Sequence, residues 1–423
     1  MSRILAYTSP AIGHLFPMTP LLLELTRRGH EVHVRTLADQ VDLMRGLGLA
    51  AEPIDARIAA VEHHDFGAKS TLAALSASVD VFVRRAAFDD GDLLAAIAST
   101  SPDAVIVDFN SWGARAAAQA WGGPWAAFCP YTPPVTSQGT PPFGPGLPPL
   151  AGPMGRLRDR LLRPLIMGQL EKRFLPGING VLAANGIPAV TSADTFFRSA
   201  PLTLVTTSEP FEYPHPDWAP DLRLIGALPW EPAADMPAWA EEPGYPFVLV
   251  TTSSEYQADE KLARAAAGLA GEPFRVVVTM PAGVADLGPL PANVRVERFV
   301  PHGPILAQAS VAVTHGGMGA TQKALSAGVP VVVVPFGRDQ LEVAARVVHA
   351  GAGVRLSPRR ITPERLRRAI LRAATMAEGA RRVAAGYRAA GGAEAGADAI
   401  EALLGQKLPD GRKLHNSGPG AAS

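Results

Sequence analysis

Short apolar segments alternate with helical patterns along the chain, in two separate series. The first series begins with the apolar residues 4–7, continues with leucines at helical spacing up to Gly29, and reaches a second strand at 32–34. A buried-type strand follows at 104–107, before a helix that ends near Trp121. A strand, a helix and a strand of these lengths form a βαβ unit, which requires a parallel sheet.

The second series starts at the apolar strand 247–250, and further strands are predicted near 275–279, 294–297, 309–314 and 329–335. Helical patterns lie between these strands. The fold class is therefore α/β, with two Rossmann-like, doubly wound parallel-sheet domains.

The composition of the connecting segments predicts the domain limits. Residues 1–215 and 244–390 are expected to form the two domains, and the Pro- and Trp-rich residues 216–243 to link them. Residues 391–405 are predicted to form a last helix that can pack back on the N-terminal domain, and the polar tail 406–423 to be disordered. A length of 423 residues agrees with two domains of this size.

Charge and cysteine content exclude several classes of protein. The 39 Lys and Arg balance 39 Asp and Glu, so the chain has no general basic field for nucleic acid. Cys129 is the only cysteine, which excludes an internal disulfide and a Cys-built zinc site. No targeting segment and no apolar run long enough to span a bilayer is visible. We expect a soluble, cytoplasmic protein, for which a homodimer stays open.

No metal site is expected. Asp90-Gly91-Asp92 has the spacing of a metal-binding pair, but it precedes a predicted helix start, where Asp is a common cap. His63-His64, His30 and His33 have no accompanying ligand cluster. The chain also lacks the glycine motif of nicotinamide dehydrogenases after its first strand, and the nucleophile elbow of α/β hydrolases.

A glycine-rich turn follows the strand 311–314 and opens a helix. This turn, His315-Gly316-Gly317-Met318-Gly319-Ala320, lets a ligand approach the backbone closely, and the helix start offers free N–H groups and a positive dipole end. These features suit a phosphate, to which His315 can add a hydrogen bond. Taken alone, the segment is equally consistent with an ordinary turn and a satisfied histidine.

Five anchors occur in order around this turn: Phe299-Val300-Pro301-His302, His315-Gly316-Gly317, Gly328-Val329-Pro330, Pro335 and Asp339-Gln340. This segment resembles the donor-nucleotide box of the UDP-glycosyltransferase superfamily, and most closely its bacterial natural-product and antibiotic branch. The resemblance implies the GT-B architecture, in which an N-terminal acceptor-binding domain and a C-terminal nucleotide-sugar-binding domain face each other across a cleft.

The resemblance also implies roles for donor-binding residues. Phe299 would stack on the base and the Val300 backbone would read its edge, while His315, Gly316, Gly317, Gly319 and Ala320 would surround the diphosphate. Asp339 and Gln340 would bind the sugar hydroxyls, and Ser253 and Ser254 match a phosphate loop, although they are also consistent with a plain strand-end turn.

One departure from the family concerns the ribose. Lys323 occupies the position of the usual ribose-binding Glu, and Lys cannot accept a hydrogen bond from a hydroxyl. The substitution favours a deoxyribose (TDP) donor over UDP. It is also consistent with a lysine that reaches a phosphate or faces solvent.

The N-terminal counterpart is the loop Ser9–Pro17, which resembles the family's Gly-His-xx-Pro loop. There His14 would act as general base, and Asp108, at the end of another strand, would orient it. A lone loop histidine is more often ordinary, and Asp108 can also be interpreted as a helix cap before Ser111.

The acceptor pocket is expected to lie within residues 57–88 and 130–174. Its candidate apolar walls are Phe66, Phe82, Trp112, Phe128, Tyr131 and Phe143. The prediction is an inverting, metal-independent glycosyltransferase without a cofactor, whose partners are a nucleotide sugar and a small apolar acceptor. A catalytically silent auxiliary protein and a nucleotide-sugar epimerase of the same fold stay open as alternatives.

Overall fold

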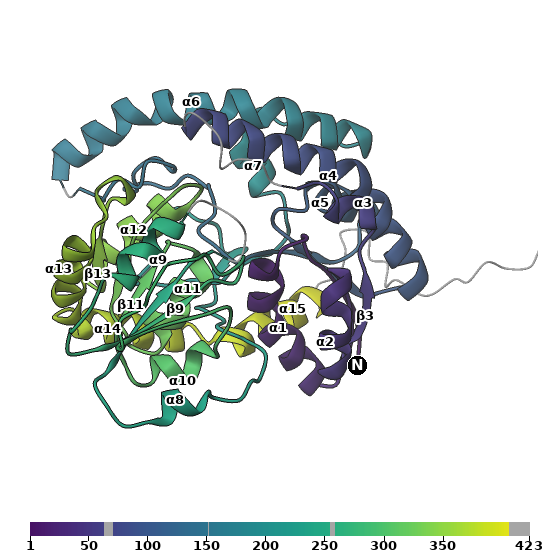
Figure 1. Ribbon diagram of the computed structural model, residues 1–423. Helices are drawn as coiled ribbons and strands as arrows, with labels where there is room; N and C mark the ends of the chain where they lie inside the picture. Colours follow the sequence, from purple (N-terminus) through teal and green to yellow (C-terminus); the bar gives the residue numbers. More distant parts are fainter. Residues whose placement is uncertain (63–70, 151, 254–258, 406–423) are drawn as a thin grey trace, which may run out of the picture.

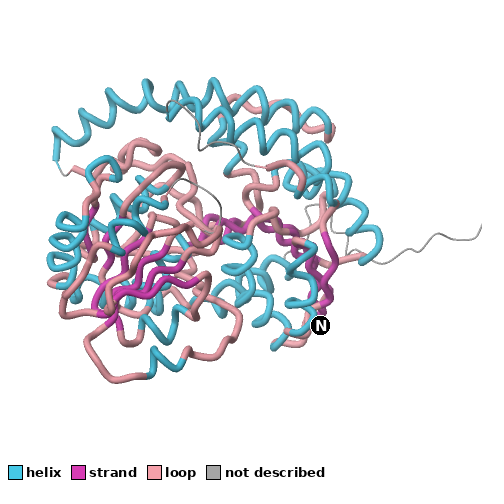
Figure 2. The backbone as a smooth tube through the Cα atoms, viewed as in Figure 1, coloured by secondary structure: helices cyan, strands magenta, loops and turns pink. Residues whose placement is uncertain are grey.

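Two parallel sheets, one in each half of the chain, form the frame of the molecule (Figure 1; Figure 2). The structure, a computed structural model, describes residues 1–62, 71–150, 152–253 and 259–405. The N-terminal sheet has seven strands in the order β3-β2-β1-β4-β5-β6-β7, and the C-terminal sheet has six in the order β10-β9-β8-β11-β12-β13. This arrangement confirms the predicted fold class.

The N-terminal half contains β1 (Arg3–Tyr7), α1 (Ile12–Arg27), β2 (Glu31–Thr36), α2 (Val41–Gly46), β3 (Ala50–Pro53), α3 (Ala56–Ala59), α4 (Thr71–Thr100), β4 (Ala104–Asp108), α5 (Trp112–Trp121), β5 (Trp125–Cys129), α6 (Gly152–Ala184), α7 (Ala193–Phe197), β6 (Thr203–Val205) and β7 (Leu222–Leu224). A short 3-10 helix covers Ala38–Gln40.

The C-terminal half contains α8 (Ala238–Glu241), β8 (Phe247–Thr251), α9 (Glu260–Ala267), β9 (Arg275–Thr279), β10 (Val294–Glu297), α10 (His302–Leu306), β11 (Ala309–Thr314), α11 (Met318–Ser326), β12 (Val331–Val333), α12 (Gln340–His349), β13 (Gly353–Arg355), α13 (Pro363–Ala374), α14 (Ala377–Ala389) and α15 (Gly392–Gly405). A second 3-10 helix covers Pro358–Arg360.

Helices cover both faces of each sheet, which is why the central strands are apolar throughout. Every residue of β4, β5 and β8 is buried, as expected for strands with no solvent-facing side. All strands pair in parallel, so the carboxyl ends of neighbouring strands lie along one edge of each sheet. Loops at these edges carry the residues of the candidate site.

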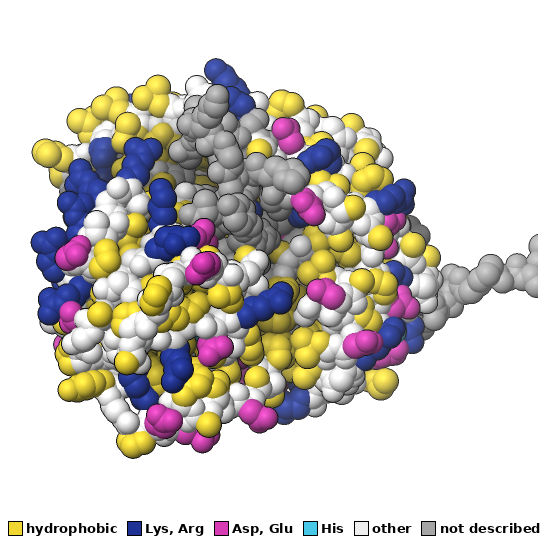
Figure 3. Space-filling view, viewed as in Figure 1, with side chains coloured by type: hydrophobic (Ala, Val, Ile, Leu, Met, Phe, Trp, Pro, Cys, Tyr) yellow, Lys and Arg dark blue, Asp and Glu magenta, His cyan; other side chains and the backbone are white. Residues whose placement is uncertain are grey.

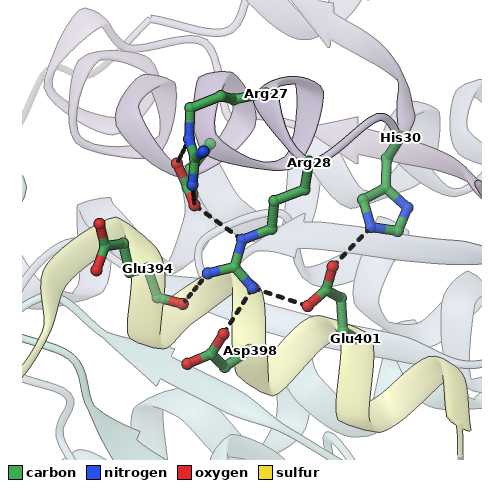
Figure 4. Close-up of polar contacts among 7 residues, drawn as sticks. Arg27, Arg28, His30, Glu394, Asp398 and Glu401 are labelled. Carbon is green, nitrogen blue, oxygen red and sulfur yellow. Dashed lines mark hydrogen bonds and ion pairs between the residues drawn. The ribbon is translucent and has the colours of Figure 1, made fainter.

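The last helix, α15, returns to the N-terminal half and packs against α1 (Figure 4). Arg28, which follows α1, donates to Asp398 at 2.6 Å and to Glu401 at 2.7 Å, and His30 lies 3.0 Å from a Glu401 oxygen. Gly396 leaves room for the packing, because a Cβ there would lie 3.0 Å from Leu21 Cδ1. The chain therefore passes between the two halves twice: once after β7, near residue 226, and once between α14 and α15.

Three details of the sequence prediction were wrong. Residues 222–224, expected in the linker, form the edge strand β7 of the N-terminal sheet. Asp90 and Asp92 lie inside α4 rather than at its start, and Asp92 accepts a hydrogen bond from Tyr7 at 2.9 Å. The arginine-rich sequence from Thr362 to about Arg388 predicts one helix, but this segment is divided into α13 and α14.

The arginines of α13 lie on its outer face, as a solvated helix surface requires. Figure 3 shows Lys and Arg side chains along the edge of the molecule over this helix. Arg365, Arg367, Arg368 and Arg372 are exposed, while Leu366 and Ile370 are buried beneath them. Within the described ranges, none of the helices combines the length and the apolar character needed to cross a bilayer.

Candidate active site

A cavity of about 1110 Å³ lies between the two halves, at the carboxyl edges of both sheets. Its N-terminal wall includes the β1–α1 loop and residues that follow β4 and β5. Its C-terminal wall includes residues that follow β8, β11 and β12. Pockets for one small ligand are typically about 300–1,000 Å³, so this cavity lies just above that range.

His14 and Asp108 meet at the N-terminal edge of the cavity. His14 Nδ1 lies 2.7 Å from Asp108 Oδ2. The Asp108 side chain is fully buried and that of His14 is 17 % exposed, on the cavity wall. The other Asp108 oxygen accepts from the Asn110 backbone N–H at 2.8 Å, so this turn holds the carboxylate in one orientation. An imidazole held at Nδ1 by a carboxylate keeps Nε2 as its basic atom.

Two further residues, which sequence reasoning missed in this role, complete the surroundings of His14. Tyr131 OH donates to Asn110 Oδ1 at 2.6 Å, and Asn110 Nδ2 lies 3.4 Å from His14 Nε2. Burial raises the pKa of Tyr131 well above its ordinary value, so its phenol stays a donor at neutral pH. The Asn110–His14 contact is long and therefore weak, and an incoming hydroxyl can replace it. The position of Asn110, two residues after the strand-end Asp108, was the available signal.

The glycine turn after β11 has the close packing that its sequence suggests. Gly316 has φ +94°, and a Cβ there would lie 2.9 Å from Gln340 Cβ. A Cβ on Gly317 would lie 2.3 Å from His315 Nε2, so this glycine makes room for the imidazole. α11 follows directly, and Met318, Gly319 and Ala320 of its first turn line the cavity.

His315 is buried on the cavity wall. Its Nδ1 has no hydrogen-bond partner among the described residues. Burial lowers the pKa of His315 to about 4, so the ring is neutral at neutral pH. Thr251, at the end of β8, also lines the cavity, and its hydroxyl likewise lacks a partner in the described part of the chain. Unsatisfied buried polar atoms beside a helix start indicate a site for a polar ligand.

Asp339 and Gln340 lie on the cavity wall at the start of α12. Gln340 Oε1 accepts from the backbone N–H groups of Phe336 and Gly337 at 2.7 and 3.0 Å, which fixes this loop. Burial raises the pKa of Asp339, and the field of His14 acts on it in the opposite direction. The predicted base, His14, and the predicted sugar-binding carboxylate, Asp339, line one cavity from opposite halves.

The remaining donor-side predictions have different surroundings. Phe299 is 53 % exposed and lines the cavity, whereas the Val300 side chain is buried in the C-terminal core. Ser253 lines the cavity, and its backbone N–H donates to Asp259. Ser254 lies outside the described residues.

Lys323 is partly buried and forms an ion pair with Glu231. Its Nζ donates to Glu231 Oε2 at 2.9 Å, and Glu231 Oε1 accepts from the Gly303 backbone at 2.7 Å. Burial lowers the pKa of the adjacent His302 to about 4, and the Lys323 charge adds to this shift. Sequence reasoning missed Glu231, which lies in the predicted linker and places a carboxylate beside the lysine.

Four predicted aromatic residues, Phe82, Trp112, Tyr131 and Phe143, line the N-terminal side of the cavity. Trp112 packs against Phe82 and Phe174 with ring centroids 5.3 and 5.6 Å apart. Phe128 was predicted wrongly, because it is fully buried on the α1 side of the sheet and does not reach the cavity. Phe66 lies outside the described residues.

Within residues 1–62, 71–150, 152–253 and 259–405, no three His, Cys, Asp or Glu residues are grouped to hold a metal ion. Burial raises the pKa of the Cys129 thiol, which is fully enclosed at the end of β5. His14, which pairs with the buried Asp108, and the first turn of α11 line the cleft from opposite halves.

Comparisons with known proteins agree with this geometry. Residues 264–399 match the family model "Erythromycin biosynthesis protein CIII-like, C-terminal domain". The chain is 34 % identical over 391 residues to 4'-demethylrebeccamycin synthase of Lentzea aerocolonigenes, covering 87 % of this chain and 91 % of that one.

Solved structures show the same fold. The calicheamicin glycosyltransferase CalG4 superposes with a TM-score of 0.75 at 24 % identity, covering 97 % of this chain and 100 % of its own. The glycosyltransferase VinC in complex with dTDP superposes with a TM-score of 0.69 at 24 % identity, covering 95 % and 99 %. The chain therefore belongs to the EryCIII-like family of natural-product glycosyltransferases, and it has their GT-B fold.

Proposed function

We propose that this glycosyltransferase moves a sugar from a nucleoside-diphosphate donor to a hydroxyl of an apolar natural product, with inversion at the anomeric carbon and His14 as general base. The observation that carries the proposal is the 2.7 Å contact between His14 Nδ1 and the buried Asp108, on the cavity wall opposite Asp339. A lone alcohol is a poor nucleophile near neutral pH, so a positioned base is needed.

The proton follows a short path in this mechanism. Asp108 holds the Nδ1–H, so that His14 Nε2 takes the proton from the acceptor hydroxyl as its oxygen attacks the anomeric carbon. The imidazolium that forms is stabilised by the Asp108 carboxylate. A single displacement from the face opposite the leaving group inverts the anomeric centre, so an α-linked donor gives a β-glycoside.

The leaving diphosphate is assigned to the C-terminal side. The N–H groups at the start of α11 can donate to phosphate oxygens, where negative charge grows as the bond breaks, and His315 lines the cavity beside them and can add a hydrogen bond. Asp339, which lines the same cavity as His14, can accept hydrogen bonds from sugar hydroxyls.

The donor nucleotide is proposed to be TDP rather than UDP. Lys323 cannot accept a hydrogen bond from a ribose hydroxyl, and its ion pair with Glu231 engages one oxygen of the nearby carboxylate. The complex of VinC with dTDP shows that the same fold accommodates a thymidine nucleotide in another protein.

The acceptor is proposed to be an apolar ring compound. The aromatic side chains Phe82, Trp112, Phe143 and Phe174 line the N-terminal side of the cavity, and flat apolar molecules pack well against such walls.

The test measures nucleoside-diphosphate release with TDP-glucose and UDP-glucose, with and without a panel of hydroxylated aromatic acceptors such as 4-methylumbelliferone. We expect acceptor-dependent release, faster with the TDP donor, and a β-linked product by NMR coupling constants. Sugar modification without an acceptor would instead support an epimerase, and no turnover of any donor would support an auxiliary protein. An α-linked product would refute the inverting mechanism.

A further inference from the structure

Three buried charged residues connect the two halves behind the cavity. Arg346 of α12 donates through Nε to Glu212 Oε1 at 2.7 Å and through Nη1 to Glu342 Oε2 at 2.8 Å. Glu212 belongs to the N-terminal half and follows β6, whereas Glu342 and Arg346 lie one turn apart on α12. Their side chains are 0 %, 3 % and 4 % exposed, respectively. We call Glu212, Glu342 and Arg346 the interdomain latch.

The latch holds both ends of one N-terminal loop. Glu342 Oε1 accepts from the backbone N–H groups of Gly144 and Gly146 at 2.8 and 2.9 Å. Glu212 Oε2 accepts from Thr132 Oγ1 at 3.0 Å. The loop that follows β5 is therefore fixed to α12 of the other half, through carboxylates that share one arginine.

Gly146 shows how closely this loop lies against α12. Its φ is +61°, and a Cβ there would lie 2.2 Å from the backbone oxygen of Leu341. Only glycine fits this approach without displacing backbone. The contact is thus specific in shape as well as in charge.

Each end of this connection leads to a different side of the cavity. Phe143 and Pro145, the neighbours of the two held glycines, line the acceptor side. Asp339 and Gln340, which lie within one helical turn before Glu342 at the start of α12, line the donor side. A helix is rigid over one turn, so the acceptor wall and the sugar-binding residues are held at one separation.

Electrostatics favours the charged form of this network. Burial alone would raise the pKa of Glu212, but the Arg346 charge and the hydrogen bond from His215 outweigh it and lower the pKa to about 2. Removal of one charge would leave its partners buried and uncompensated, so the network holds one arrangement.

We propose that Glu342 is a positioning residue for the acceptor: with Arg346, it holds the Phe143–Pro145 wall at a fixed distance from the donor sugar. The inference rests on the proposed function. Glu342 belongs to the donor-binding half and does not itself line the cavity. Through the loop it would nevertheless determine how tightly the acceptor binds and how well water is excluded from the donor.

The experiment compares Glu342→Ala, Glu342→Gln and a control, Glu272→Ala, which removes the surface partner of Arg367 in the same half. TDP-glucose is the donor, and the acceptor is 4-methylumbelliferone or the best substrate of the panel. For Glu342→Ala we expect at least a tenfold higher acceptor KM and a larger fraction of donor lost to hydrolysis. TDP binding should change less than twofold.

Glu342→Gln keeps an oxygen for Gly144 and Gly146 but loses the charge that pairs with Arg346, so it should recover only part of the acceptor affinity, and Glu272→Ala should match the wild type. If Glu342→Ala does not fold, Gly146→Ala displaces the same loop with every latch charge in place, and the same changes are expected. Unchanged acceptor KM and hydrolysis in a folded variant of the loop contact would overturn the inference. A wild-type protein that transfers to no acceptor would instead refute the proposed function.

Discussion

The two walls of the cleft are prepared for their ligands in opposite ways. On the N-terminal wall, Asp108, His14, Asn110 and Tyr131 form a continuous series of contacts. On the C-terminal wall, the buried Nδ1 of His315 has no partner among the described residues. Buried polar atoms are normally satisfied, because an unmade hydrogen bond is costly. The proposed base is thus held in place by protein contacts alone, whereas the proposed donor wall keeps a buried polar atom without a partner among the described residues.

The largest effect should come from the N-terminal wall. His14→Ala removes the proposed base, and we expect kcat to fall by about 10²- to 10⁴-fold. TDP affinity should stay within twofold, because His14 belongs to the other wall. The measurement is acceptor-dependent TDP release together with TDP binding by calorimetry.

The control for this prediction is His33→Ala, a histidine that pairs with Glu31 on the same sheet, away from the cavity. It should keep the wild-type rate. If the kcat of His14→Ala stays within tenfold of the wild type, His14 is not the base. If the variant also loses TDP affinity, His14 contributes to the donor site as well, and the two walls do not have separate roles.

The second prediction concerns pH. The folded pKa values of His302 and His315 are about 4, below the ordinary value near 6.5, because burial disfavours their charged forms. Between these pKa values the unfolded chain binds more protons than the folded chain does. The contribution of each histidine to the free energy of unfolding is therefore fully present above about pH 6.5, and it is lost as the pH drops toward 4. Between pH 7 and 5, each histidine should lower the free energy of unfolding by up to about 2 kcal/mol.

Urea titrations at both pH values give this difference. The double variant with His302→Asn and His315→Asn should lose most of it, whereas His33→Asn should retain it. If the free energy of unfolding depends on pH equally in the double variant and the wild type, the burial of these two histidines is not the cause of that dependence.

The smallest effect is expected from the donor wall. His315→Ala removes a proposed donor to the diphosphate, and a hydrogen bond to a charged group contributes about 1.5–3 kcal/mol, so TDP should bind roughly 10- to 100-fold more weakly. Calorimetric titration with TDP measures this change, and thymidine, which lacks the diphosphate, should show no difference between variant and wild type. Equal TDP affinity in both proteins would show that His315 does not face the diphosphate.

Much of this site could be predicted from sequence, because its residues follow strand ends. Asp108 ends β4, and His14 and His315 follow β1 and β11, so the parallel topology alone brings them to the sheet edges. Phe128 shows the limit of that reasoning. It lies within β5, where successive side chains alternate between faces, and its side chain points into the α1 side of the core.

The features that sequence reasoning missed depend on contacts between distant segments. Glu231 and Lys323 are 92 positions apart, and Glu212 and Arg346 are 134 apart, with no periodic pattern to relate them. α6 was missed for a local reason, since it continues through Pro164 and Pro176, residues that usually end a helix. Packing against α4 and α5 supports it instead.

The return of α15 to α1 has a consequence for protein engineering by domain exchange. A hybrid of two relatives spliced once near residue 226 would combine a host α1 with a foreign α15, and Arg28 would face unmatched residues in place of Asp398 and Glu401. A second splice near Gly392, where the backbone already contacts Ile225 at 2.7 Å, would keep this helix with its own sheet. Recombination with two crossovers should therefore yield more soluble hybrids than recombination with one.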